Sequence, residues 1–119
     1  KDDGFAVPTV IAVLDSEIGS AGATVEALRR AADAMPMQTD IIFAFVSNDI
    51  DAIEALTGAA REGEHILMSA RRLARDCGVT ATPVIIICDR DAVVKEIING
   101  YNNDLTDVVI QKTVTSAGK

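Results

Sequence analysis

The sequence predicts an α/β fold in which a central mixed sheet is flanked by helices, with the element order β-α-β-α-β-β-α. Three observations predict it: short apolar runs typical of buried strands, amphipathic segments between them, and a polar triplet between the last two strands. Of the 119 residues, 49% are hydrophobic, which suffices for one core. We therefore expect a single domain over residues 1–119. Residue 1 is Lys rather than an initiator Met, and excision from a larger or membrane-anchored protein is one interpretation.

The first half of the chain contains two predicted strands. Residues 8–14 form an almost continuous apolar run that ends at Asp15, as expected for a strand buried on both faces. A polar loop over 15–22 follows, and then a helix that Pro36 ends. The apolar face of this helix is predicted to hold Val25, Leu28, Ala32 and Met35. Residues 41–46, rich in β-branched and aromatic side chains, predict the second strand.

The middle of the chain is predicted to be helical. Residues 47–49 supply capping side chains for a helix whose apolar face holds Ile50, Ile53, Leu56 and Ala60. After Gly63, we expect a further helix from about Glu64 to Asp76, or one kinked helix made of both pieces. Its apolar stripe is predicted to hold Ile66, Ala70, Leu73 and Cys77. Gly78 is placed to end this helix in a left-handed conformation.

The last third of the chain predicts a hairpin and a final helix. Residues 84–87 are the strongest strand signal, and the polar group 89–91 separates them from a strand over 93–98. These two strands should pair antiparallel. Asp89 and Asp91 alternate as in some calcium loops, but the other oxygen ligands are missing, so we interpret them as turn formers. The final helix follows residues 102–104 and is predicted to bury Leu105, Val108 and Val109.

One segment resembles the thioredoxin superfamily. From Cys77 to Ile87 the chain has a helix end, Gly-Val, a few variable residues, Pro83 and an apolar strand. The hairpin, Gly100 and the closing helix extend the resemblance over most of the chain. The resemblance implies a thioredoxin-like fold, with a cis bond between Thr82 and Pro83 beside the active site. Without it, a trans proline that begins a strand would be the default interpretation.

The sequence departs from that superfamily where the oxidoreductases carry Cys-x-x-Cys. The matching window is Ile18–Ala21, and the first 76 residues contain no cysteine. Dithiol chemistry at this place is therefore excluded. A second, weaker resemblance is to thioredoxin-like assembly proteins of bacterial conjugative secretion systems, some of which lack the cysteines and have an element similar to residues 78–83.

The leading functional hypothesis is a redox-inactive, thioredoxin-like module that binds or assembles proteins. Proline lacks an amide donor, so the turn before the strand can present backbone groups to an extended peptide. We expect a protein or peptide partner to lie between this turn and the loop after the first strand. The predicted binding residues are Ser16, Glu17, Ile18, Gly19, Ser20, Thr82 and Pro83. No catalytic residue, metal or cofactor is expected in this interpretation.

One alternative is a monothiol oxidoreductase or peroxidase-like protein that works through Cys77. This cysteine follows the predicted helix 64–76, and the negative end of a helix dipole disfavours a thiolate. Its place on the apolar stripe favours a small buried side chain instead. Cys88 ends a buried strand and is also expected to be buried. The rise along residues 83–88 makes a disulfide between Cys77 and Cys88 improbable.

The other alternative is a small-molecule or nucleotide-binding α/β domain that uses the loop from Asp15 to Gly22. Gly19, Ser20, Gly22 and Thr24 precede or begin a helix whose N-terminus could receive an anion. However, the sequence contains neither a G-x-G-x-x-G nor a G-x-x-x-x-G-K-[ST] motif, and Asp15 with Glu17 would repel phosphate. A turn with a helix cap is the favoured interpretation.

Composition narrows the classes of partner. With 18 acidic and 11 basic residues the net charge is −7, which disfavours nucleic acid. The pairs Arg29-Arg30 and Arg71-Arg72 are expected on solvated helix faces. No apolar run is long enough to cross a bilayer, so we expect a soluble domain without membrane insertion. A cytoplasmic and a periplasmic location both stay open, as does the oligomeric state. His65 is the only histidine and is expected to be solvated.

Overall fold

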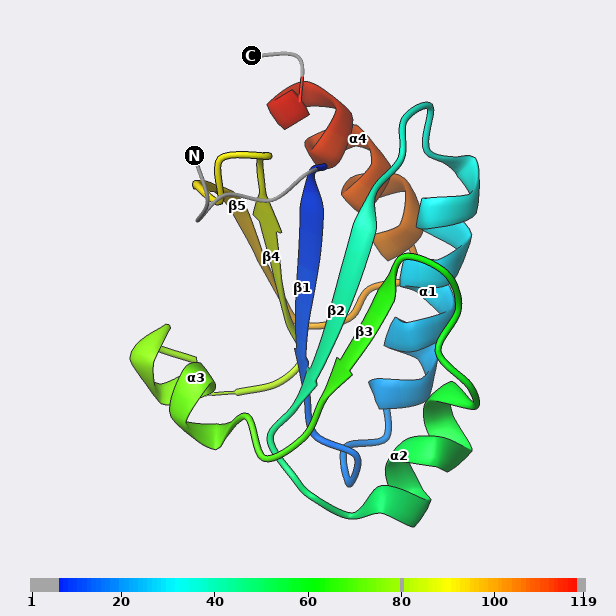
Figure 1. The fold of residues 1–119 in the computed structure, drawn as a ribbon, viewed down its shortest axis with the longest axis vertical. Helices are drawn as coiled ribbons and strands as arrows, with labels where there is room; N and C mark the ends of the chain where they lie inside the picture. The colour runs from blue at the N-terminus through cyan, green and yellow to red at the C-terminus, as the bar shows by residue number, and fades with distance from the viewer. Residues whose placement is uncertain (1–6, 80, 118–119) are drawn as a thin grey trace.

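The computed structural model describes residues 7–79 and 81–117, and in this part five strands form one mixed sheet (Figure 1). The strands are β1 (Thr9–Leu14), β2 (Asp40–Phe45), β3 (Glu64–Leu67), β4 (Val84–Cys88) and β5 (Val94–Asn99). The helices are α1 (Ala21–Ala34), α2 (Ile50–Thr57), α3 (Arg71–Asp76) and α4 (Leu105–Ala117). The spatial order is β3-β2-β1-β4-β5, with β1–β2 and β2–β3 parallel and the other two pairs antiparallel. The predicted α/β class with a mixed sheet is confirmed.

The main core lies between one face of the sheet and the helices α1, α2 and α4. Alternate residues of each strand point to this face, because successive side chains of a strand face opposite ways. The fully buried aromatic rings are Phe43 and Phe45, both from β2. Val25 and Leu28 of α1 pack on the same cluster, as the helical spacing predicts. The hydroxyl of Thr106 donates to the carbonyl of Ala27 at 3.1 Å, which joins α4 to α1.

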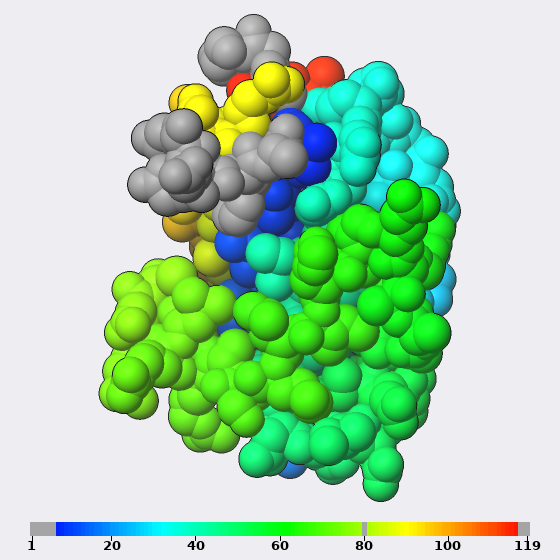
Figure 2. All heavy atoms as spheres, viewed as in Figure 1, coloured from blue at the N-terminus to red at the C-terminus, as the bar shows by residue number. Residues whose placement is uncertain are grey.

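The opposite face of the sheet carries a smaller core under α3. Its buried members are Val13, Ala74, Val84, Ile86 and Cys88. Because α3 is only six residues long, it covers part of this face. The side chains of β5 beyond it stay open, and Ile97 is 56% exposed. In Figure 2 the yellow-green α3 segment forms a lobe that stands out from the sheet.

The predicted helix over 64–76 is wrong in its first half, where β3 occupies Glu64–Leu67. These residues pair in parallel with β2, so that Ile66 lies beside Phe43. Ile66 faces the core, whereas its neighbours His65 and Leu67 are exposed, so the strand shows a single alternation of buried and exposed residues. A pattern this short does not distinguish a strand from a helix. Gly63, with φ of +81°, precedes this strand, and the observed order is β-α-β-α-β-α-β-β-α.

Two of the predicted helix limits rest on capping residues, and the structure confirms both. Asp49 caps α2 by accepting the N–H of Ala52 at 3.2 Å. This helix ends at Thr57, so Ala60 is not part of its apolar face. Gly78 has φ of +76°, the left-handed conformation expected after α3. Asp89 forms the predicted turn.

Arg29 does not lie on a solvated face, contrary to the prediction. Its guanidinium donates to both carboxylate oxygens of Glu64 at 2.9 Å and to the carbonyl of Thr57 at 2.7 Å. It also lies 5.8 Å from the centroid of the Phe43 ring. The side chain of Arg29 is 13% exposed and that of Glu64 is 5% exposed. Arg29 therefore links α1 to β3 and to the end of α2, whereas Arg30 is exposed as expected.

Candidate functional site

The loop after β1 forms two successive turns. The amide of Ile18 donates to the carbonyl of Asp15, and the amide of Ala21 to that of Ile18, both at 3.0 Å. The carboxylate of Asp15 accepts the N–H of Glu17. The hydroxyls of Ser16 and Ser47 are 2.8 Å apart and join this loop to the end of β2. These bonds leave the Ile18 side chain 43% exposed.

Helix α3 is held next to that loop by the end of β2. The amide of Ala70 donates to the carbonyl of Phe45 at 2.8 Å, and the amide of Ser69 to that of Ser47 at 2.9 Å. Ser47 thus contacts both the loop after β1 and the start of α3. Ala74 is the buried residue of α3 and packs on Val13. The first turn of α3 is therefore fixed beside the carboxyl ends of β1 and β2.

The chain leaves α3 through a left-handed turn and enters β4 at Pro83. The amide of Val79 donates to the carbonyl of Ala74 at 2.8 Å, which brings the chain back toward the sheet. Thr80, a residue of the predicted motif, lies outside the described residues. The Thr82–Pro83 bond is cis. The carbonyl of Pro83 accepts the N–H of Gly100, whereas the backbone of Thr82 has no backbone partner among the described residues.

Two adjoining cavities surround this turn, and we call them together the groove. The arginine-side cavity has a volume of about 490 Å³ and is lined by Asp15, Ile18, Val46, Arg71, Ala74, Arg75, Val79, Ala81 and Thr82. The β5-side cavity has a volume of about 340 Å³ and is lined by Cys77, Gly78, Val79, Ala81, Thr82, Pro83, Val84, Ile86, Ile97, Asn99 and Gly100. The two share Val79, Ala81 and Thr82, so the turn forms their common wall.

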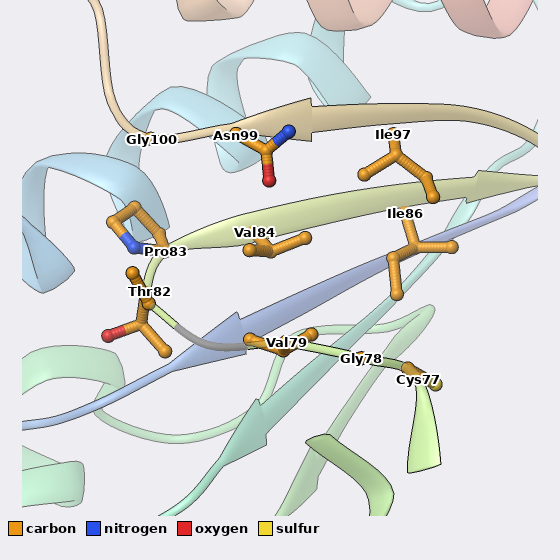
Figure 3. A pocket seen from close by; sticks show the side chains of 11 residues that line it. Cys77, Gly78, Val79, Thr82, Pro83, Val84, Ile86, Ile97, Asn99 and Gly100 are labelled. Atoms are coloured by element: carbon orange, nitrogen blue, oxygen red, sulfur yellow. The ribbon is translucent and has the colours of Figure 1, made fainter. Parts of the chain in front are cut away.

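The β5-side cavity is apolar at its base. In Figure 3, Val84 and Ile86 of β4 lie between β5 and the segment Cys77–Val79. The side chain of Ile86 is 6% exposed and that of Val84 5%, while Ile97 of β5 is more than half exposed. The cavity thus offers apolar surface to a side chain from outside the chain.

The structure brings some of the predicted binding residues together. Ile18 and Thr82, 64 positions apart in the sequence, both line the arginine-side cavity. Pro83 lines the β5-side cavity. The other four predicted residues, Ser16, Glu17, Gly19 and Ser20, line neither cavity. Of these, Ser16 positions the loop through Ser47.

Several groove residues were not predicted from the sequence. Arg71 is exposed, as expected, but its place beside the cavity was not predicted, and Arg75 was not singled out. Their position depends on where α3 begins, which the predicted longer helix obscured. Ile97 and Asn99 lie on β5, and their contact with the groove follows from the strand order rather than from a local pattern. The spacing Arg71-x-x-x-Arg75 is the one sequence signal that marks two of these residues as sharing a helix face.

The two cysteines differ in their surroundings, and both thiols are free. Cys88 is buried as predicted, and burial raises the pKa of its thiol. The expectation that Cys77 is buried is wrong, because α3 ends at Asp76 and Cys77 is exposed at the end of the helix. The buried stripe of this region consists of Ala70 and Ala74 instead. Cys77 lines the same cavity as Pro83.

We also searched the described residues for a metal site, a histidine site, a capped helix start and a membrane-spanning helix. No group of three or more His, Cys, Asp or Glu residues there could hold a metal ion. His65 is exposed on the edge strand β3, with its side chain 61% accessible and 3.9 Å from the Asp40 carboxylate. At the start of α1, Ser20 makes no side-chain cap. None of the helices formed by these residues has the length and apolar character needed to cross a membrane.

Comparison with solved structures shows the fold. The chain is similar to a protein assigned as the thiol:disulfide interchange protein DsbE of Chlorobium tepidum, with a TM-score of 0.78, 14% identity, and coverage of 94% of this chain and 81% of that one. It is also similar to a secreted Mycobacterium tuberculosis disulfide oxidoreductase, with a TM-score of 0.75, 14% identity, and coverage of 93% and 83%. The exposed lipoprotein thioredoxin Etrx1 of Streptococcus pneumoniae has a TM-score of 0.73, 12% identity, and coverage of 95% and 87%. No protein-family model and no curated protein matches the sequence. The chain has a thioredoxin-like fold.

Proposed function

We propose that this protein binds an extended segment of a partner protein in the groove around Thr82, without dithiol exchange at the start of α1. The observation that carries the proposal is the pair of adjoining cavities that share the wall formed by Val79, Ala81 and Thr82. An extended segment presents its side chains alternately to opposite sides. Such a segment crossing the turn would place side chains in the two cavities.

Two features of the groove support this use. The backbone of Thr82 is free of backbone partners among the described residues, so its N–H and C=O are available to a peptide main chain. The exposed side chain of Ile97 extends the apolar surface of the cavity beyond Ile86. Main-chain hydrogen bonds would supply affinity, and the cavities would supply specificity.

Selection from a display library of random short peptides tests the proposal. The protein should enrich a family of peptides, and Ile97→Thr should weaken their binding about tenfold by removing apolar contact. Ile50→Thr is the matched control, because Ile50 is 57% exposed and lines neither cavity. Absence of enrichment, or equal loss in both variants, would contradict the proposal.

A second candidate is a monothiol oxidoreductase that uses Cys77, and the names of the similar solved structures favour it. The specific observation is that Cys77 is exposed and lines the cavity beside Pro83. Its thiolate would attack a disulfide of a bound partner, forming a mixed disulfide and releasing the other partner thiolate. The thiolate of a second, external thiol would then attack the partner's sulfur in that mixed disulfide, form a new disulfide with it and release Cys77 as a thiolate.

The rate of thiol exchange distinguishes this candidate from simple binding. The wild-type protein would form a mixed disulfide with a disulfide-containing peptide faster than free cysteine does, and Cys77→Ser would abolish the reaction. An exchange rate no higher than that of free cysteine would exclude the candidate. If Cys77→Ser loses thiol exchange but still binds the peptide, peptide binding in the groove does not depend on the thiol.

A further inference from the structure

The arginine-side cavity contains a concentration of positive charge in an acidic protein. Arg71, Arg72 and Arg75 are three of the 11 Lys and Arg residues, whereas the chain as a whole carries a net charge of −7. All three are exposed on α3. Arg71 and Arg75 line the cavity and Arg72 does not. Two of the three arginines of α3 thus lie on the side of the helix that borders the groove.

These two guanidinium groups are not used within the described part of the fold. Neither Arg71 nor Arg75 makes an ion pair there, in contrast to Arg29 and Arg61. The one carboxylate that lines the cavity belongs to Asp15, and one of its oxygens accepts the N–H of Glu17. Two arginines and one aspartate therefore line the cavity, which gives its lining a surplus of positive charge.

The spacing of the two arginines matches an extended acidic segment. Residues four apart on a helix have Cβ atoms about 5–6 Å apart. Side chains on the same side of an extended chain are about 6.6–6.8 Å apart, because they lie two residues apart at about 3.3–3.4 Å each. Two carboxylates in an Asp/Glu-x-Asp/Glu sequence can therefore pair with Arg71 and Arg75 at the same time. Guanidinium groups bind carboxylates by paired hydrogen bonds.

We propose that the groove selects a partner segment with two acidic residues separated by one, followed or preceded by an apolar residue. The acidic pair contacts Arg71 and Arg75, and the apolar residue enters the β5-side cavity next to Ile97. This inference rests on the proposed peptide-binding function and adds the chemical class of the partner. In this proposal α3, which covers only part of the sheet face below it, carries the two arginines that bind the partner.

The peptides selected from the display library test this inference by their composition. Enrichment of Asp or Glu at paired positions, with an apolar residue nearby, is the expected result. A chosen peptide is then labelled and titrated by fluorescence anisotropy, beside a version in which Asn replaces Asp. The Asn version should bind about tenfold more weakly. Each exposed ion pair contributes only a small free energy, and the loss of two such pairs adds up to this change in affinity.

Variants of α3 separate a directed pairing from general charge attraction. Arg71→Gln combined with Arg75→Gln should remove the preference for the acidic peptide, while Arg72→Gln, which removes a charge from the same helix, should keep it. If Arg72→Gln weakens binding as much as the double variant, or if the selected peptides are not acidic, the inference is wrong. In the second case, loss of binding in Ile97→Thr would still support the proposed function. If no peptide is enriched, both the proposed function and this inference are wrong.

Discussion

Replacing Arg29 by Met is expected to destabilise the fold by about 3 kcal/mol. The substitution keeps an unbranched apolar side chain over Phe43 but removes the three hydrogen bonds to Glu64 and Thr57. The carboxylate of Glu64, 5% exposed, would then lose its charged partner. Of its hydrogen bonds to the described residues, the one from the N–H of Arg61 remains.

The magnitude follows from the burial of the pair. Removing one partner of a buried ion pair costs roughly 3–5 kcal/mol, because an uncompensated charge stays behind. The low end applies here, since the Arg29 side chain is 13% exposed and water can reach part of the site. With a urea dependence of about 1.5 kcal/mol per molar, the midpoint of unfolding should fall by about 2 M.

The effect should depend on pH in a defined direction. Burial acts to raise the pKa of Glu64, but the hydrogen bonds from Arg29 and from the Arg61 N–H outweigh it, so the pKa is lowered. A carboxyl group whose folded-state pKa is lowered stabilises the fold fully above its unfolded value of about 4.3, and this stabilisation is lost as the pH falls through the folded value. The difference between wild type and Arg29→Met should therefore shrink below about pH 4.

Urea unfolding followed by circular dichroism measures both effects. The matched control is Arg61→Met, because Arg61 pairs with Asp33 at 2.8 Å but the side chains are 48% and 64% exposed. Exposed pairs contribute about 0–1 kcal/mol, so this control should change little. Equal losses in the two variants, or a loss for Arg29→Met that does not vary with pH, would refute the reasoning.

Two further predictions concern the turn after α3 and the cysteines. An added Cβ meets no atom within 4 Å at either Gly78 or Gly19, so the two sites differ in backbone conformation: φ is +76° at Gly78 and is not positive at Gly19. Gly78→Ala should therefore cost about 1–2 kcal/mol, whereas Gly19→Ala should be neutral; thermal unfolding of both variants checks this, and equal effects would contradict it. N-ethylmaleimide should modify Cys77 in the native protein and Cys88 only after unfolding, as mass spectrometry can show. Labelling of Cys88 at the same rate would mean that the smaller core is not packed as described.

The sequence predicts the parts of this fold whose patterns are long or marked by special residues. β1, β2 and β4 are continuous apolar runs, and the start of α2 and the end of α3 follow from Asp49 and Gly78. Residues 64–67 form a strand because they lie beside β2, a long-range contact that a four-residue pattern does not reveal. The same error hid the start of α3 and with it the position of Arg71.

The candidate site was predictable in part, for a related reason. The resemblance of residues 77–87 to the thioredoxin superfamily points to Thr82 and Pro83, and the position of the missing Cys-x-x-Cys points to the loop around Ile18. The partners of these residues come from elements that are distant in sequence. Ile97 reaches the groove through the hairpin, and Arg75 through the hydrogen bonds that hold α3 to the end of β2.

Nuclear magnetic resonance tests the groove most directly. A peptide selected by the protein is titrated into the isotope-labelled chain, and the amide shifts are followed residue by residue. The account predicts that the largest changes occur on both sides of the shared wall, at Ile18, Val79, Thr82 and Ile97. Largest changes along α4 or the edge strand β3, with these four residues unaffected, would contradict it.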